Sequence, residues 1–326
     1  MTIKLAGVSL DPPVFLAPLA GITDLPFRNL VQEFGAGLVV SEMVASQEMV
    51  QAHAPTRARA ELGLGVANTA VQIAGREARW MAEAARMLQG QGARIIDINM
   101  GCPAKKVTGG QSGSALMRDP DLALRLIEAV VAAVEVPVTL KMRLGWDDDS
   151  INAPQLARLA EGAGVQMITV HGRTRCQFYK GRADWRKVGE VVHAVGIPVI
   201  VNGDIIDTAT ARMALQQSRA AGVMVGRGAQ GAPWRLAEIA STLFGAPAPE
   251  IPQGDALVAL VRGHYMAMLD FYGQELGVKV ARKHLGWYMD HAPVAPPLRR
   301  AILTENDPQR VLDLLGQIAG MQRQAA

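Results

Sequence analysis

Cysteine is scarce in this sequence, and long apolar runs are absent. The two cysteines, Cys102 and Cys176, form no paired C-x-x-C ligand set, so we expect neither a disulfide framework nor a structural zinc site. No stretch reaches the roughly 20 apolar residues that a membrane-spanning helix needs. The segment from Met1 to Pro13 lacks the apolar core of a secretory signal peptide. These absences predict a cytoplasmic protein that holds no metal and does not contact a membrane.

Neither sign of charge is in large excess. The 326 residues include 33 Lys and Arg and 30 Asp and Glu, which gives a formal net charge of +3 with histidine neutral. An excess this small is compatible with nucleic-acid binding and is also common among enzymes that bind no nucleic acid. Any polyanionic partner must therefore be held by a local basic patch.

Short apolar runs alternate with longer helical patterns, such as Glu77–Gln89, Asp121–Val134 and Ala153–Gly162. Apolar runs of this kind are typical of parallel strands buried on both faces, and eight β/α units in about 240 residues match the size of a (β/α)8 TIM barrel. An open doubly wound sheet is the alternative, but no G-x-G-x-x-G pattern follows the first run. The eight runs are Val14–Ala17, Leu38–Ser41, Ala70–Ala74, Ile95–Asn99, Val138–Met142, Met167–His171, Val199–Asn202 and Gly222–Gly226.

The composition changes after the last of these units. The segment Gly245–Gly254 is rich in proline and glycine and is typical of a linker between domains. Helical periodicity dominates after it, with one helix directly after the linker, a second from near Val278 and a third from near Asp307. The sequence therefore predicts a barrel domain over residues 1–243 and a small helical bundle over residues 244–326.

One strand end carries a reactive residue. The run that begins at Ile95 ends in Asn99, and a Gly101-Cys102-Pro103 turn follows. Active sites of α/β barrels lie at the carboxyl ends of the strands. A free cysteine is often only a small apolar residue that closes a turn. Its place on this loop, beside Lys105 and Lys106, nevertheless makes Cys102 a candidate catalytic residue.

Polar groups at the other strand ends belong to the same predicted site, although each alone has a structural explanation. Glycine-bearing turns follow the seventh and eighth strands, where barrels commonly bind phosphate, and Arg227 lies in the second turn. Backbone N–H groups of glycine turns approach phosphate oxygens closely. These residues predict a phosphorylated ligand and leave open whether it is a flavin mononucleotide or a sugar phosphate. The residues at these other strand ends are Pro18, Ala20, Gln72, Lys141, Arg143, His171, Arg173, Asn202, Gly203, Asp204, Gly226 and Arg227.

The run Ala17–Arg28 resembles the opening signature of the tRNA-dihydrouridine synthases. Further motifs resemble the same family in the same order over nearly the whole chain, and Leu19 stands where methionine is commoner. The Ala104-Lys105-Lys106 form, together with Ala281–His284 and Trp287-Tyr288, is similar to the bacterial DusB branch. The other motifs are Ser41–Met43, Val71–Gly75, Asp97–Val107, Val170–Thr174, Ile200–Asp204 and Gly226-Arg227.

The resemblance implies an FMN enzyme that uses NADPH to reduce the C5–C6 double bond of selected uridines in tRNA. Cys102 would protonate uracil C5 while reduced flavin gives hydride to C6, and Asn99 and Arg173 would face the substrate. A thiol is largely protonated at neutral pH and can serve as the acid. The residues that would hold FMN are Pro18, Leu19, Ala20, Gln72, Lys141, His171, Asn202, Gly203, Asp204, Gly226 and Arg227.

A target base inside folded tRNA must be flipped out of its stack, which calls for a basic surface around the site. The partners expected are tRNA and NADPH, with no obligatory protein partner. The cations predicted to form the rim of the barrel are Arg173, Arg175, Lys180, Arg182, Arg186 and Lys187, and those of the helical domain are Lys279, Arg282, Lys283, Arg299 and Arg300.

Two other functions agree less well with these residues. A flavin-barrel pyrimidine dehydrogenase of the dihydroorotate type would not need a basic helical appendage, and the loop around Cys102 fits it poorly. A non-catalytic RNA-binding or regulatory relative would lack Cys102 or Lys141, and both are present. The first function, a tRNA-modifying reductase, therefore agrees best with the sequence.

Overall fold

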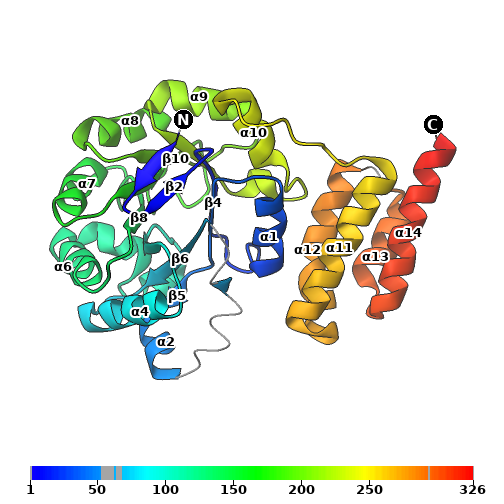
Figure 1. Ribbon diagram of the computed structural model, residues 1–326, viewed down its shortest axis with the longest axis horizontal. Helices are drawn as coiled ribbons and strands as arrows, with labels where there is room; N and C mark the ends of the chain where they lie inside the picture. The colour runs from blue at the N-terminus through cyan, green and yellow to red at the C-terminus, as the bar shows by residue number, and fades with distance from the viewer. Residues whose placement is uncertain (1, 53–61, 64–67, 293, 326) are drawn as a thin grey trace.

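The computed structural model describes residues 2–52, 62–63, 68–292 and 294–325, and within them eight parallel strands close into a barrel (Figure 1). The sheet closes because the last strand pairs with the first and β4 pairs with β6. Each predicted apolar run coincides with one strand, with ends that differ by at most one residue, so the predicted TIM barrel is confirmed. The strands are β3 (Val14–Leu16), β4 (Leu38–Val40), β6 (Thr69–Ala74), β7 (Ile96–Met100), β8 (Val138–Arg143), β9 (Met167–His171), β10 (Val199–Asn202) and β11 (Gly222–Val225).

Helices surround this barrel and bury one apolar stripe each against the outer faces of the strands. Several begin at a carboxylate that caps the first turn: Asp24 accepts the N–H of Phe27, and Asp119 accepts the N–H of Leu122. The surrounding helices are α1 (Leu25–Glu33), α2 (Ser46–Ala52), α4 (Ala78–Gly90), α6 (Pro120–Val131), α7 (Ala153–Gly162), α8 (Trp185–Ala194), α9 (Thr208–Ser218) and α10 (Arg235–Phe244). Shorter elements are β5 (Val44–Ala45), α5 (Lys105–Thr108), and the 3₁₀ turns η1 (Gly113–Arg118) and η2 (Arg227–Ala229).

An antiparallel hairpin seals the amino-terminal end of the barrel. Its strands β1 (Ile3–Leu5) and β2 (Val8–Leu10) bury alternate side chains against the barrel interior, including Phe15, Ile95 and Met224. Because this end is filled by apolar side chains, the opposite end, where the strands terminate, is left for a ligand.

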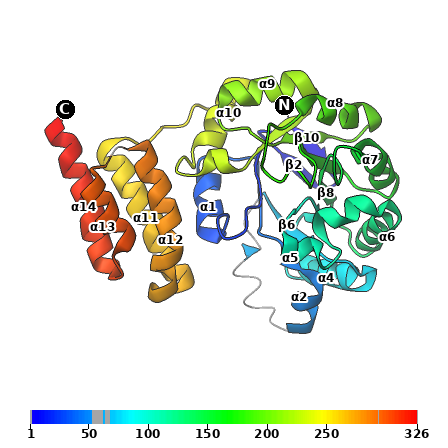
Figure 2. The same ribbon diagram turned by 180° about the vertical axis from the view of Figure 1, so that it is seen from behind.

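A second group of helices lies beside the barrel and has its own apolar core, built around Tyr265, Met268 and Leu285 (Figures 1 and 2). The linker joins it to α10, whose C-cap Gly245 adopts a left-handed conformation. The helices are α11 (Gly254–Tyr272), α12 (Gln274–His291), α13 (Pro296–Thr304) and α14 (Pro308–Ala325).

Two details of this group differ from the sequence-based expectation. The second helix starts at Gln274, four residues ahead of Val278. Gly273, at φ +78°, is the only residue between this helix and the one before it, so the helical conformation is interrupted for a single residue. A helix at Pro296–Thr304 was not expected, since it opens with two prolines and buries only Ile302. The third predicted helix does begin after Asp307, whose carboxylate accepts the N–H groups of residues 309 and 310.

Helix α1 connects the barrel to this helical group. The ring of Phe27 lies 5.7 Å from that of His264 and 5.0 Å from that of His284, measured between centroids. The hydroxyl of Tyr272 donates to the carboxylate of Asp24 at 3.0 Å. The loop that precedes α1 is therefore held from the side of the helical group as well as from the barrel.

Candidate active site

A cavity of about 540 Å³ opens at the carboxyl ends of the barrel strands. It is formed by the loops that follow these strands, as the sequence predicted for a barrel site. All of the sequence-predicted site residues line it except Arg173. Those that line it are Pro18, Leu19, Ala20, Gln72, Asn99, Cys102, Lys141, Arg143, His171, Asn202, Gly203, Asp204, Gly226 and Arg227.

The backbone of Cys102 is fixed on both sides. The side-chain oxygen of Asn99 accepts the N–H of Cys102 at 2.9 Å and that of Gly101 at 3.1 Å. The hydroxyl of Ser114 donates to the carbonyl of Cys102 at 2.8 Å. Cys102 is half-buried and lines the cavity. The loop therefore presents the thiol at a defined place, where it can reach a bound molecule.

A buried polar network lies beneath this loop. The amide of Asn99 donates to Gln72 Oε1 at 2.6 Å, and Gln72 Nε2 donates to Asp97 Oδ2 at 2.6 Å. Thr139 donates to the other oxygen of Asp97 at 2.6 Å. Burial raises the pKa of Asp97, against the hydrogen bonds from Gln72 and Thr139. The network sets which way the amides of Gln72 and Asn99 face.

Sequence reasoning missed Asp97 as part of this support. Its only signal is the single carboxylate of a short buried strand, where a buried charge must find partners.

Lys141 projects from β8 into the cavity. Its ammonium group donates to Asn202 Oδ1 at 3.2 Å, and Asn202 Nδ2 donates to the carbonyl of Met224 at 2.8 Å. Burial, helped by the positive charge of Arg143, lowers the pKa of Lys141 to about 8, although Asp97 and Cys102 act in the opposite direction. The ammonium form therefore still predominates at pH 7, and an anion that binds near it would stabilise this form.

His171 and Gly203 form a concave wall after β9 and β10. Burial and nearby positive charges, that of Arg143 first, lower the pKa of His171 well below its ordinary value, so the ring is neutral at neutral pH. Its buried Nδ1 has no hydrogen-bond partner within the described part of the chain. Gly203 has φ +110°, and a Cβ there would lie 2.9 Å from that of Ala183 and 3.2 Å from His171 Cε1. Only glycine keeps this hollow open.

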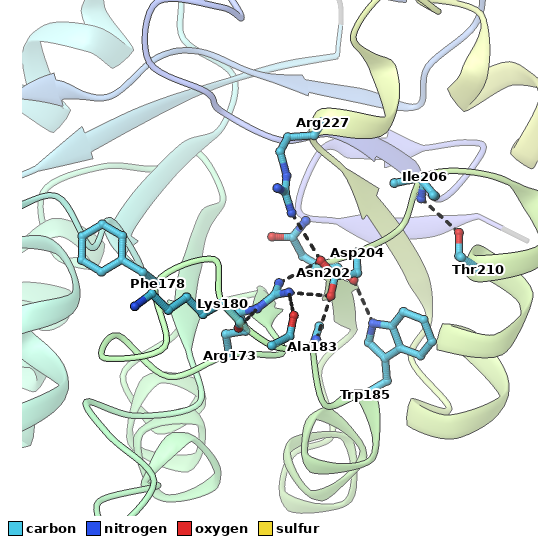
Figure 3. Close-up of polar contacts among 12 residues, drawn as sticks. Arg173, Phe178, Lys180, Ala183, Trp185, Asn202, Asp204, Ile206, Thr210 and Arg227 are labelled. Carbon is cyan, nitrogen blue, oxygen red and sulfur yellow. Dashed lines mark hydrogen bonds and ion pairs between the residues drawn. The ribbon is translucent and has the colours of Figure 1, made fainter.

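Asp204 joins two arginines beside that wall (Figure 3). Arg173 donates to both carboxylate oxygens, at 2.9 and 2.6 Å, and Arg227 approaches one of them at 3.4 Å. Although burial raises it, the pKa of Asp204 is held below its usual value by hydrogen bonds from Arg173 and Ala183 and by the charges of the two arginines. Arg227 is 55% exposed, so it can turn from Asp204 toward a ligand.

The expectation that Arg173 faces the substrate and belongs to the basic rim does not agree with this arrangement. Its side chain is only 2% exposed, and it also donates to the carbonyls of Lys180 and Gly181. Arg173 holds the loop after β9 against Asp204. A sequence motif cannot show this, because an arginine at a strand end can turn inward or outward.

Arg143 ties two loops of the cavity together. Its Nε donates to the carbonyl of Gly101 at 2.8 Å, and its Nη1 donates to those of Thr174 and Phe178 at 2.8 and 3.0 Å. Phe178 and Tyr179 also line the cavity, and sequence reasoning did not assign them a role. The signal available was a pair of aromatic residues inside a run of cations.

Among the other predicted rim cations, Lys180, Arg182 and Arg186 are exposed and Lys187 is half-buried. Arg175 is also half-buried, with its guanidinium 4.6 Å from the ring centroid of Trp146. In the helical group, Arg282 is turned toward Glu305 and Asn306, while Lys279 pairs with Glu275 and Arg299 with Asp290. The exposed cations in these regions are Lys105, Lys106, Lys180, Arg182, Arg186, Lys279, Lys283 and Arg300.

Metal-ligating clusters and membrane spans are both absent from the described residues. No group of three or more His, Cys, Asp or Glu side chains among them is placed to hold a metal ion. None of the described helices combines the length and apolar character that crossing a membrane requires.

Comparison with known proteins gives consistent results. Residues 15–323 match the family model described as dihydrouridine synthase (Dus). The chain is 62% identical to a "Probable tRNA-dihydrouridine synthase" of Rhodobacter capsulatus over 100% of both chains. It is 51% identical to a protein of the same description from Rickettsia conorii, over 97% of this chain and 96% of that one. It is 45% identical to "tRNA-dihydrouridine synthase B" of Xanthomonas campestris pv. campestris, over 95% and 94% of the two chains.

Proposed function

Because the chain belongs to the dihydrouridine synthase family, we propose that it reduces the C5–C6 double bond of uridines in tRNA with FMN as cofactor and NADPH as reductant. The observation that carries this proposal is the convergence of Cys102, Lys141 and the glycine-bearing turns after β10 and β11, with Arg227, on one cavity. Its volume of about 540 Å³ lies within the range of sites for small ligands and cofactors.

The phosphate of FMN would bind at the wall formed by His171 and Gly203, beside the turn that follows β11. Gly203 leaves a hollow that any Cβ would fill, and the buried Nδ1 of His171 has no partner within the described chain. Asp204 would repel a phosphate if it were alone, but Arg173 and Arg227 neutralise it. Arg227, with the turn that begins at Gly226, would then contact the phosphate.

The flavin ring would bind in the centre of the cavity. Lys141 would place its positive charge beside the ring, and the amide of Gln72 would hydrogen-bond the pyrimidine edge. The segment Pro18–Ala20 would cover the ring from the end of β3. When bound, FMN supplies the hydride that it has taken from NADPH.

Cys102 would supply the proton. Its thiol donates H⁺ to uracil C5 as C6 receives the hydride, so the double bond is reduced by one hydride and one proton, and solvent returns a proton to the sulfur. A positioned acid is needed because hydride addition leaves enolate-like charge at C4–C5. Asn99 holds the Cys102 loop in place and lines the cavity beside it, where it can contact the uracil.

We propose that tRNA covers the cavity mouth and that residues 244–326 form its second contact. The exposed cations beside the mouth, Lys105 and Lys106 among them, would hold the phosphates of the flipped nucleotide strand. In the helical group, Lys283 and Arg300 are better candidates than Arg282, whose guanidinium is used within the fold.

The test is direct. Purified protein should be yellow with the spectrum of FMN, NADPH should bleach it, and tRNA that lacks the modification should gain dihydrouridine, detected by nucleoside mass spectrometry. Mapping dihydrouridine in the tRNA of cells that lack this gene identifies the positions. A colourless protein that ignores added FMN, or tRNA that stays unchanged beside a bleached flavin, would contradict the proposal.

A further inference from the structure

The loop after β9 presents an aromatic side chain at the cavity mouth. Tyr179 is 53% exposed and nevertheless lines the cavity. Single exposed apolar residues are common on protein surfaces, but this ring lies at the rim of a cavity, and an amphipathic aromatic side chain in such a place is suited to contact a ligand. Tyr179 has no part in the reaction proposed above, so its position calls for a separate explanation.

The loop that carries Tyr179 is fixed before any ligand arrives. The carbonyl of Phe178 accepts from Arg143, while those of Lys180 and Gly181 accept from Arg173. Phe178 itself has φ +56°, a conformation that a non-glycine residue keeps only when its surroundings impose it. The ring of Tyr179 is therefore presented at little cost in conformational entropy.

Charges surround this ring. The guanidinium carbon of Arg227 lies 5.5 Å and that of Arg143 lies 5.8 Å from the ring centroid, and the rings of Phe178 and Tyr179 meet at 75°. Lys180, next in the chain, is exposed. An aromatic ring between cations is the arrangement with which proteins bind single-stranded nucleic acid: the base stacks on the ring and the backbone follows the charges.

One residue, Arg143, also connects the loop that carries Tyr179 to the loop that carries Cys102. Arg143 donates at the same time to the carbonyl of Gly101, which precedes Cys102, and to that of Phe178, which precedes Tyr179. The two loops are thus held side by side by one guanidinium. A base beside the one that faces Cys102 would meet Tyr179.

We propose that Tyr179 is the stacking platform for the nucleobase next to the reacting uridine, an inference that rests on the proposed function. Once the target base has left its stack, its neighbour loses a stacking partner, and the phenol ring replaces it. The occupant is a base of tRNA because Tyr179 lines the cavity and is also 53% exposed, so it lies at the mouth, where the polynucleotide would continue while the target base fills the interior.

The experiment compares Tyr179→Ala, Tyr179→Leu and Tyr179→Phe in the FMN-loaded protein. Base–aromatic stacking is worth about 1–3 kcal/mol, so the Ala variant should lower kcat/KM for tRNA by about 5- to 160-fold, mainly through KM. Leu should remain low because it fills space without a π face, whereas Phe should restore most of the loss. Met213→Ala, at an exposed apolar residue of α9, is the control and should match the parent.

The outcomes separate the inference from its premise. If the parent forms no dihydrouridine, the proposed function fails and the platform falls with it. If the parent is active and the Ala variant keeps its kcat/KM for tRNA, or Leu restores it, the platform is wrong. A rise in KM for NADPH that exceeds the effect on tRNA would assign Tyr179 to the reductant instead, and loss of flavin from the Ala variant would assign it to the support of Arg227.

Discussion

The side-chain oxygen of Asn99 accepts the backbone N–H of Cys102 at 2.9 Å, while its amide nitrogen donates to Gln72 at 2.6 Å. One side chain thus links the loop of the proposed acid to the amide proposed to hold the flavin. Through Gln72 the link continues to the buried carboxylate of Asp97. The proposed acid and the proposed cofactor site are therefore positioned by the same buried hydrogen bonds.

Replacing the proposed acid should separate the two half-reactions. Cys102→Ala should retain flavin and still oxidise NADPH, but its rate of dihydrouridine formation should fall by about 10² to 10⁴, the usual loss for a positioned acid. Stopped-flow bleaching of the flavin and nucleoside analysis measure the two steps. The control is Cys176→Ala, which changes an exposed cysteine and should behave like the parent. Dihydrouridine formation at the parental rate would show that another group donates the proton.

Flavin binding should depend on pH through Lys141. Its pKa of about 8 means that the ammonium form, which attracts an anionic cofactor, is present below pH 8 and is lost as pH rises above it. The affinity of the flavin-free protein for FMN should therefore decline between pH 7 and pH 9.5, by up to about tenfold per pH unit above the pKa.

The quenching of FMN fluorescence during titration measures this affinity. Lys141→Met should bind FMN more weakly at pH 7 and should lack the decline near pH 8. A variant that keeps the parental pH profile would assign the titration to a different group.

The exposed lysines after Cys102 should contribute to tRNA binding. Lys105→Ala with Lys106→Ala should reduce the slope of log affinity against log salt by roughly 0.7 to 0.9 for each phosphate that a lysine no longer neutralises. The decrease in affinity should be similar for different tRNAs, because phosphate contacts position the RNA and do not read its sequence. Fluorescence anisotropy with labelled tRNA over a salt series gives the slope.

A matched control exists on the opposite face of the barrel. Lys4→Ala with Arg94→Ala also removes two exposed cations, but these lie at the amino-terminal end of the strands. This variant should keep the parental slope. Equal effects from both pairs would indicate that only the net charge matters.

Acid should weaken the fold through His284. Burial, with the charge of Lys283 beside it, lowers the pKa of His284 to about 4, whereas the unfolded chain keeps the ordinary 6.5. Between these values the unfolded state binds more protons, so stability falls as pH drops below 6.5. For His284 alone the loss between pH 7.5 and pH 5 should reach about 2 kcal/mol.

Urea unfolding at the two pH values tests this. His284→Phe, which keeps an aromatic ring against Phe27, should lose about 2 kcal/mol less than the parent on acidification. His291→Gln changes an exposed histidine and should show the parental loss. An equal loss in all three proteins would mean that other groups control the acid sensitivity.

Much of the barrel followed from local sequence. Strands such as Met167–His171 are buried on both faces and therefore appear as continuous apolar runs, and helix α7 has the predicted bounds. The helix Pro296–Thr304 was not predicted because it buries a single residue, Ile302, which is too few to produce a helical pattern of apolar residues. Likewise, helix α12 begins four residues earlier than predicted, at Gln274, and this start depends on a single glycine, Gly273.

Chain order and strand direction were enough to predict which residues gather at the mouth of the barrel, because every loop after a parallel strand lies at the same end. The contacts that their side chains make depend instead on how the loops pack against one another. Arg173 turns inward to Asp204 and Arg282 turns to Glu305, whereas Tyr179 remains exposed above Arg143. Each of these choices depends on a partner far along the chain, whose distance and direction are set only when the loops pack together.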